Sequence, residues 1–135
     1  MNTTTTDEPA VFRLNVEVAD LDEAFAFYTK LLGIVGRRQP GARCYFTCGA
    51  VTLQVLDVSG HGAVTPLPKS LYLTVHGLDA VYGRAKELGC LATGQVHDEP
   101  AGAVTVRPWG ERSFYVEDPW GSSLCFVEAG TVYEG

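Results

Sequence analysis

The chain has 135 residues, of which 46% are hydrophobic and 19% are charged, as is typical of one compact globular domain. Its formal net charge of −6 argues against a nucleic-acid-binding protein, because such proteins contact phosphates through clustered Lys and Arg. No segment approaches the roughly 18 consecutive apolar residues of a membrane span. We therefore expect neither a nucleic-acid partner nor a membrane partner.

The first third of the chain predicts a strand, a helix and two more strands. Residues 1–9 lack the basic and apolar parts of a signal peptide, so we expect a disordered lead and a cytoplasmic protein. Residues 12–18 alternate between apolar and polar, which predicts a strand. Asp20 and Glu23 have capping-box spacing, and Gly33 ends the helix. Its apolar residues recur at helical spacing: Leu21, Ala24, Phe25, Tyr28, Leu31 and Leu32. Turn residues then separate strands at 43–48 and 51–57.

The second half repeats this order after a Gly- and Pro-rich linker at residues 59–69. A strand at 70–76 leads to a helix whose apolar positions are Leu78, Val81, Tyr82, Ala85 and Leu88. Further strands are expected around 94–97, 103–108, 112–117 and 123–128. Both helices open with Leu-Asp and end with Leu-Gly. The sequence thus predicts an α+β fold of two tandem βαβββ modules, about 11–58 and 70–130, within one domain at 10–131.

The four cysteines, Cys44, Cys48, Cys90 and Cys125, have no C-x-x-C spacing. We expect them to be reduced. Cys44, Cys48 and Cys90 are interpreted as small apolar residues of the interior.

Two neighbouring segments of the second half are distinctive: Pro108-Trp109-Gly110-Glu111-Arg112-Ser113-Phe114 and Asp118-Pro119-Trp120-Gly121. Together they resemble the vicinal oxygen chelate superfamily. That superfamily includes glyoxalase I, extradiol dioxygenases and bleomycin-type resistance proteins. The resemblance covers roughly residues 11–130 and also includes Val18 to Leu21, Phe27-Tyr28, Leu32-Gly33, Val75, Leu78-Asp79 and Leu88-Gly89. It implies two mixed sheets that curl around a concave cleft, with the helices outside.

Metal-dependent members of this superfamily bind the ion through His and Glu on the first and last strands of each module. The resemblance puts these positions at Arg13, Gln54, Ser70 and Cys125, and none of the four is His, Asp or Glu. A guanidinium would repel a divalent ion at contact distance. We therefore expect no metal and no cofactor. A displaced metal site near Glu17 and His76 is an alternative, while His61 and His97 are interpreted as surface residues.

Strand alternation puts a second, largely polar set of side chains on the inner faces of the sheets. The planar fork of Arg13 suits a carboxylate or a carbonyl, and aromatic rings suit a flat or cationic ligand. The predicted ligand-binding residues are Arg13, Asn15, Gln54, Ser70, Tyr72, Trp109, Tyr115 and Cys125. One alternative is that this polar face is an ordinary solvent-exposed surface without a ligand. Another is that Arg13 forms an ion pair with Glu17 or Glu128.

The resemblance favours a metal-free small-molecule-binding protein of the bleomycin-resistance type, which sequesters a drug or metabolite and so confers antibiotic resistance. The alternative is a glyoxalase-like or dioxygenase-like enzyme with an atypical or absent metal site, acting on a small carbonyl or aromatic substrate. Such an enzyme would use Arg13 with Cys125 or Glu17 for acid–base steps. By analogy we expect a homodimer, with each cleft formed within one chain or between two.

Overall fold

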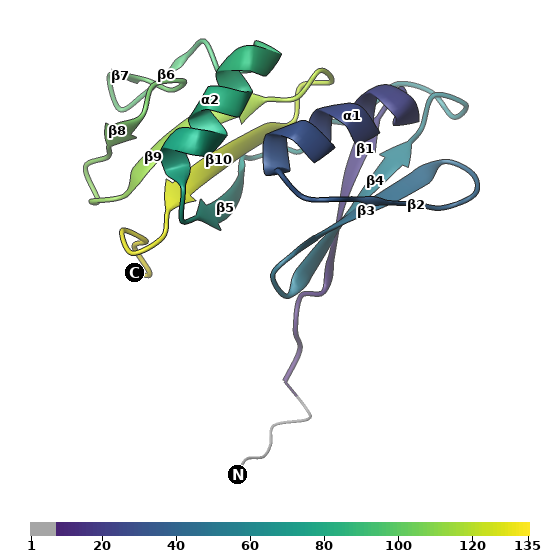
Figure 1. The fold of residues 1–135 in the computed structure, drawn as a ribbon, viewed down its shortest axis with the longest axis horizontal. Coiled ribbons are helices and arrows are strands. Elements are labelled where there is room, and N and C mark those ends of the chain that lie inside the picture. Colours follow the sequence, from purple (N-terminus) through teal and green to yellow (C-terminus); the bar gives the residue numbers. More distant parts are fainter. Residues whose placement is uncertain (1–7) are drawn as a thin grey trace.

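The computed structural model describes residues 8–135; residues 1–7, most of the lead expected at 1–9, lie outside the described part. Two modules lie side by side, and each consists of a four-stranded sheet with one helix packed on it. Both helices lie on the same side of the sheets (Figure 1). The predicted α+β architecture of two tandem modules is confirmed. Neither helix within residues 8–135 has the length and apolar character required to cross a bilayer.

The first module follows the predicted order closely. Its elements are β1 (Arg13–Val18), α1 (Leu21–Leu32), β2 (Arg37–Arg38), β3 (Arg43–Cys48) and β4 (Val51–Asp57). The strand order is β1-β4-β3-β2, with β1 parallel to β4 and the other pairs antiparallel. The parallel pair arises because α1 carries the chain back across the sheet between β1 and the later strands.

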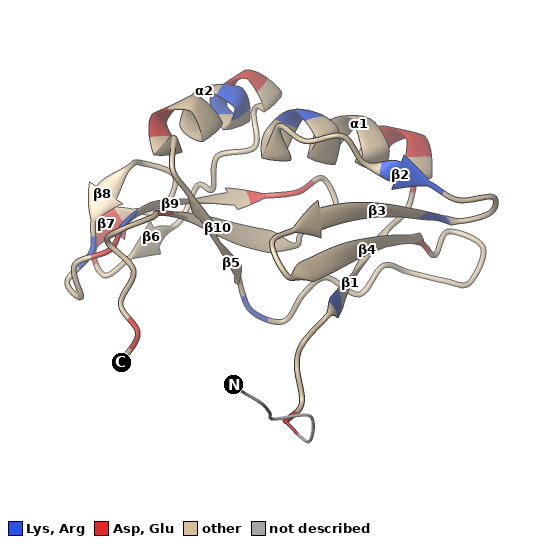
Figure 2. Cartoon of the chain, turned by 60° about the horizontal axis from the view of Figure 1, so that its bottom comes forward, with Lys and Arg blue, Asp and Glu red and all other residues tan. Residues whose placement is uncertain are grey.

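The second module repeats this arrangement with a longer excursion between its helix and its last strands. Its elements are β5 (Leu71–Val75), α2 (Leu78–Leu88), β6 (Gln95–Val96), β7 (Glu99–Pro100), β8 (Thr105–Val106), β9 (Arg112–Glu117) and β10 (Ser123–Glu128). The sheet order is β5-β10-β9-β8, and β6 pairs with β7 in a separate hairpin. Figure 2 shows the helices on one side of the sheets and the C-terminal tail leaving on the other.

The ends of the helices follow the predicted signals. The Asp20 carboxylate accepts a hydrogen bond from the backbone N–H of Glu23 at 2.9 Å, as an N-cap should. Gly33 and Gly89 both end their helices at φ +68°, a left-handed conformation that glycine adopts without a steric penalty. Gly77, which precedes α2, provides no side-chain cap.

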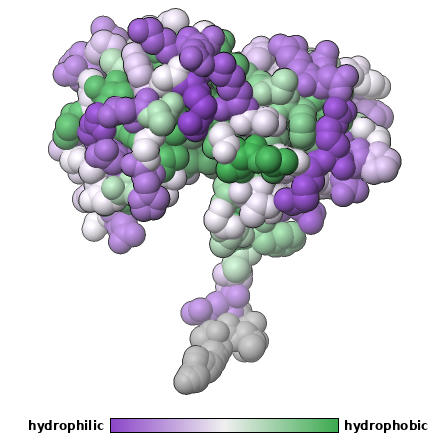
Figure 3. Space-filling view, viewed as in Figure 1, coloured by the Kyte–Doolittle hydropathy of each residue, from purple (hydrophilic) through white to green (hydrophobic). Residues whose placement is uncertain are grey.

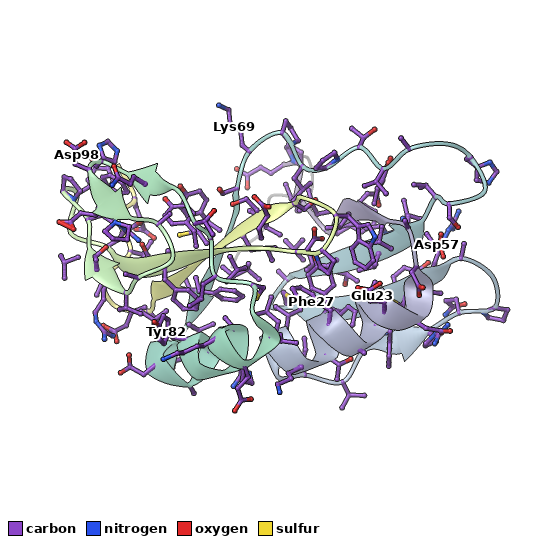
Figure 4. The ribbon with its side chains drawn as sticks, turned by 90° about the horizontal axis from the view of Figure 1, so that it is seen from above. Glu23, Phe27, Asp57, Lys69, Tyr82 and Asp98 are labelled. Carbon is purple, nitrogen blue, oxygen red and sulfur yellow. The ribbon has the colours of Figure 1, made fainter. Side chains whose placement is uncertain are left out.

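The main core lies between the helices and the sheets and continues across both modules. Tyr28 and Leu31 of α1 are fully buried, as the apolar pattern predicted. Phe27 was not part of the predicted apolar face, yet only 7% of it is exposed. It points from α1 toward the junction of the modules (Figure 4), where it lines a cavity together with residues 88–93. The helical pattern missed Phe27 because α1 contacts two partners, its own sheet and the second module.

A buried hydrogen bond links the two modules. The Tyr28 hydroxyl donates to Asp118 Oδ2 at 2.6 Å, and the backbone N–H groups of Trp120 and Ser122 donate to Oδ1 at 2.9 Å. Burial, together with the adjacent Asp118 carboxylate, raises the pKa of Tyr28 well above its ordinary value. The Asp-Pro-x-Gly turn of the sequence therefore supplies a carboxylate that joins the modules.

Candidate ligand-binding site

The inner face of the first module, opposite α1, contains three of the predicted ligand-binding residues. Asn15 lies beside Gln54, whose side-chain amide donates to Asn15 Oδ1 at 2.7 Å. The exposed Arg13 is paired in register with Thr52, and its guanidinium lies 4.9 Å from the centre of the Phe12 ring. A cavity of about 270 Å³ is lined by Phe12, Arg13, Arg37, Gln39, Tyr45 and Thr52.

The inner face of the second module is more covered than strand alternation suggested. Cys125 is fully buried, and Tyr115 is only 7% exposed. Both pack beneath the segment after α2, where Ala92 and Ala101 exchange backbone hydrogen bonds with Tyr115. Burial raises the pKa of the Cys125 thiol. The thiol therefore does not line an open cavity, because this segment fills the space that alternation alone would leave to solvent.

The covering segment is held by Arg107, which sequence reasoning missed. This residue is 2% exposed, and its Nε donates to Ser113 Oγ at 3.0 Å. Its Nη2 donates to the carbonyls of Ala101, Ala103 and Ser113. The guanidinium also lies 5.3 Å from the centre of the Tyr115 ring, while Nη1 has no hydrogen-bond partner. Arg107 directly follows the two-residue strand β8, and an arginine in such an irregular segment gives no sequence signal of burial.

A second inner cavity of about 340 Å³ lies where the C-terminal tail meets the second sheet. The Glu111 carboxylate, 8% exposed, accepts hydrogen bonds from Trp109 Nε1 at 2.8 Å and from the Tyr133 backbone N–H at 2.9 Å. The cavity is lined by Tyr72, Leu73, Thr74, Trp109, Glu111, Val127, Val132 and Tyr133. Tyr72 and Trp109 were predicted. Glu111 and Tyr133 were not, because neither strand alternation nor the superfamily's ligand positions select them.

The predicted residues fall into two groups in one chain. Arg13, Asn15 and Gln54 belong to the first sheet; Ser70, Tyr72, Trp109, Tyr115 and Cys125 belong to the second module. Between the modules lies an apolar groove of about 610 Å³, and its lining includes Leu14, Ile34, Val51, Leu71, Val75 and Phe126. In Figure 3 a hydrophobic patch lies where the modules meet, above a notch that separates their lower parts. Arg13 and Trp109 line different cavities.

The outer side of the molecule has a cavity of about 680 Å³ between α1 and the end of α2. Asp118, its most buried carboxylate, is already bonded to Tyr28, and Lys30 pairs with Glu87 at 2.9 Å. Burial raises the pKa of the Cys90 thiol there to about 11, which keeps it protonated and unreactive near neutral pH. Asp118 and Lys30 of this cavity are thus engaged in contacts between the modules.

The four positions that the resemblance implies for a metal do not fit a divalent ion. Arg13 is a cation, the Gln54 amide is bonded to Asn15, and Ser70 Oγ shares a hydrogen bond with Ser123 Oγ at 2.7 Å. Cys125 is a buried thiol whose pKa is raised. Catalytic metal sites use His, carboxylate or thiolate ligands. Across residues 8–135, no three His, Cys, Asp or Glu side chains form a metal-binding group, at Glu17 and His76 or elsewhere.

Comparisons with known proteins agree with this architecture. Residues 11–126 match the family model described as the Glyoxalase/Bleomycin resistance protein/Dioxygenase superfamily. A search of curated proteins gave no significant match. Similar solved structures include the oxidase ChaP-H2, with 24% identity, TM-score 0.69 and coverage of 94% of this chain and 98% of that chain.

Two other solved structures have a similar fold and different functions. A bleomycin-binding protein complexed with bleomycin has 22% identity and TM-score 0.64 over 90% of this chain and 98% of that chain. Lactoylglutathione lyase from Agrobacterium tumefaciens has 22% identity and TM-score 0.61 over 92% of this chain and 96% of that chain. At these identities the similarity shows the fold, on which several activities occur.

Proposed function

The chain belongs to the glyoxalase/bleomycin resistance protein/dioxygenase superfamily, and we propose that it binds a small organic molecule on the inner faces of its sheets without a metal ion. The observation that carries this proposal is the side-chain chemistry of those faces. Arg13, Gln54, Ser70 and Cys125 replace the expected anionic or imidazole ligands with a cation, an amide, a hydroxyl and a buried thiol. None of the four suits a divalent ion, and Arg13, which lines an open cavity, suits a carboxylate or a carbonyl of an organic ligand.

The inner faces offer contacts that a drug-sized or smaller ligand requires. Small-molecule sites combine apolar or aromatic walls with a few fixed polar groups. Here the walls are Tyr45 in the first module and Tyr72 and Trp109 in the second, and the polar groups include Arg13 and Glu111. The fold shared with a bleomycin-binding protein and the net charge of −6 both favour sequestration of a cationic or aromatic drug or metabolite.

We also propose that the chain forms a homodimer. Among the described residues 8–135, β1 pairs only with β4 and β5 only with β10, so each leaves an open backbone edge beside the apolar groove. Val11, Phe12 and Tyr72 are 70%, 64% and 55% exposed near these edges. Open edges and exposed apolar side chains favour association with a second copy. Light scattering coupled to size-exclusion chromatography measures the oligomeric state directly.

The binding proposal is tested by a thermal-shift screen of cationic and aromatic compounds, bleomycin included, with and without a chelator. We expect at least one compound to stabilise the protein equally in both conditions. In Arg13→Ala the affinity for that compound should fall about tenfold, as expected for loss of one charge-assisted hydrogen bond. Arg38→Ala is the matched control, because Arg38 pairs with Asp22 on the helix side of the same module.

Two outcomes would count against the proposal. Stabilisation that disappears on chelation would indicate a metal-dependent site, and conversion of the bound compound to a product would favour the enzyme alternative.

A further inference from the structure

Glu111 has a carboxylate that is buried without a cationic partner. It is 8% exposed, and its two oxygens accept one hydrogen bond each, from Trp109 Nε1 and from the Tyr133 N–H. Both donors are neutral. An ionised carboxylate accepts about four hydrogen bonds, so roughly half of its capacity is unused. Burial of a charge is costly unless it is paired, and the remaining lone pairs therefore favour a cation.

The two arginines nearest in sequence are directed to other partners. Arg107 donates to Ser113 Oγ and to backbone carbonyls, and the ion pairs of Arg112 are with Asp79 at 3.0 Å and Glu128 at 2.8 Å. Within residues 8–135, no Lys, Arg or His nitrogen lies within 4.0 Å of the Glu111 carboxylate. The protein chain thus leaves the charge of Glu111 without a direct counter-ion.

Aromatic rings from three separate elements share the cavity with Glu111. Tyr72 comes from β5, Trp109 from the loop between β8 and β9, and Tyr133 from the C-terminal tail. Tyr72 and Tyr133 are 55% and 60% exposed, which leaves the cavity open to solvent. The indole of Trp109 is held from one side by Glu111 and from another by the His97 ring, 5.0 Å away and nearly perpendicular. Aromatic faces around a carboxylate attract organic cations.

We propose that this cavity binds the ammonium group of a small organic amine. Glu111 supplies the charge, Tyr72 and Trp109 supply aromatic faces, and Tyr133 closes the site from the tail. The cavity volume of about 340 Å³ suits a group of this size. The inference rests on the proposed function, because it names the ligand class for one part of the same inner surface.

The test is titration of the full chain with choline and with its uncharged isostere, in which carbon replaces nitrogen. The chain has two tryptophans, so NMR resolves two indole N–H signals, and Trp109→Phe assigns them. We expect choline to shift the Trp109 signal saturably while the Trp120 signal stays in place. The isostere should bind at least about tenfold more weakly, since it lacks the charge.

Two variants test the roles of the cavity residues. Glu111→Gln keeps the size and one acceptor oxygen but removes the charge, and should weaken choline binding about tenfold. Tyr133→Ala alters only an exposed tail residue and should weaken binding several-fold. Val35→Ala, which truncates an exposed apolar residue of the first module that lines none of these cavities, is the control and should leave the affinity unchanged. Urea denaturation of each variant shows whether it remains folded.

Three results would overturn the inference: no saturable shift with choline, equal affinity for the isostere, or unchanged affinity in folded Glu111→Gln. Absence of choline binding together with a metal-independent ligand from the compound screen would overturn the inference while leaving the proposed function intact. The converse result is that compound binding in the screen is lost with the chelator while choline still shifts the Trp109 signal. That result would overturn the metal-free proposal and support the ammonium site.

Discussion

Removing one hydroxyl group at the junction of the modules should destabilise the whole domain. Tyr28 is fully buried, and its hydroxyl donates at 2.6 Å to Asp118, which is 4% exposed. Tyr28→Phe removes no ring packing, yet it leaves Asp118 Oδ2 without this donor. Oδ1 keeps its bonds to the Trp120 and Ser122 backbone. A buried hydrogen bond to a charged group contributes about 1.5–3 kcal/mol, so we expect a loss of about 2 kcal/mol.

Urea denaturation followed by fluorescence measures this loss as a lower midpoint at an unchanged m-value. Tyr82→Phe is the matched control, because Tyr82 packs edge-on against Phe114 at 5.3 Å and its hydroxyl makes no hydrogen bond within residues 8–135. The control should change the free energy of unfolding by less than about 0.5 kcal/mol. A Tyr28→Phe variant as stable as the control would refute the reasoning that this bond holds the modules together.

Three further predictions concern stability. Burial raises the pKa of the Cys90 thiol from the ordinary 9.0 to about 11, so the free energy of unfolding should fall as the pH rises across this range. Equilibrium unfolding should show a smaller fall in Cys90→Ala. In Gly102→Ala the added Cβ would collide with the Ala92 backbone, so the free energy of unfolding measured in urea should fall by about 1–3 kcal/mol. The displaced segment should also expose Cys125 to thiol reagents. Arg112→Gln should lower the urea midpoint at low salt, and a decrease that did not shrink in high salt would contradict an ionic role.

The sequence predicted the fold well where local signals agree with the tertiary contacts. The predicted strands at 43–48, 51–57, 112–117 and 123–128 coincide with β3, β4, β9 and β10. Alternation, turn residues and glycine stops all depend on a few neighbouring positions, so they are readable from one chain. The burial of Phe27 was missed because it depends on the second module, whose position no local pattern specifies.

The candidate site was less predictable than the fold. Strand alternation put Asn15, Gln54, Tyr72 and Cys125 on the inner faces of their strands, and the structure adds that Asn15 pairs with Gln54 and Tyr72 with Cys125. It did not show that the segment after α2 would cover Cys125, because coverage depends on an irregular excursion held by Arg107. Nor did it select Glu111, whose importance comes from the C-terminal tail that folds over the second sheet.

The most direct test of metal-free binding is calorimetric titration of a ligand from the compound screen into protein whose metal content has been measured by elemental mass spectrometry. The titration is done on protein treated with a chelator and again after addition of Zn, Ni, Mn or Fe(II). We predict no stoichiometric metal in the purified protein and the same affinity in every titration. Stoichiometric metal, or binding that is lost on chelation and restored by one of these ions, would contradict the account.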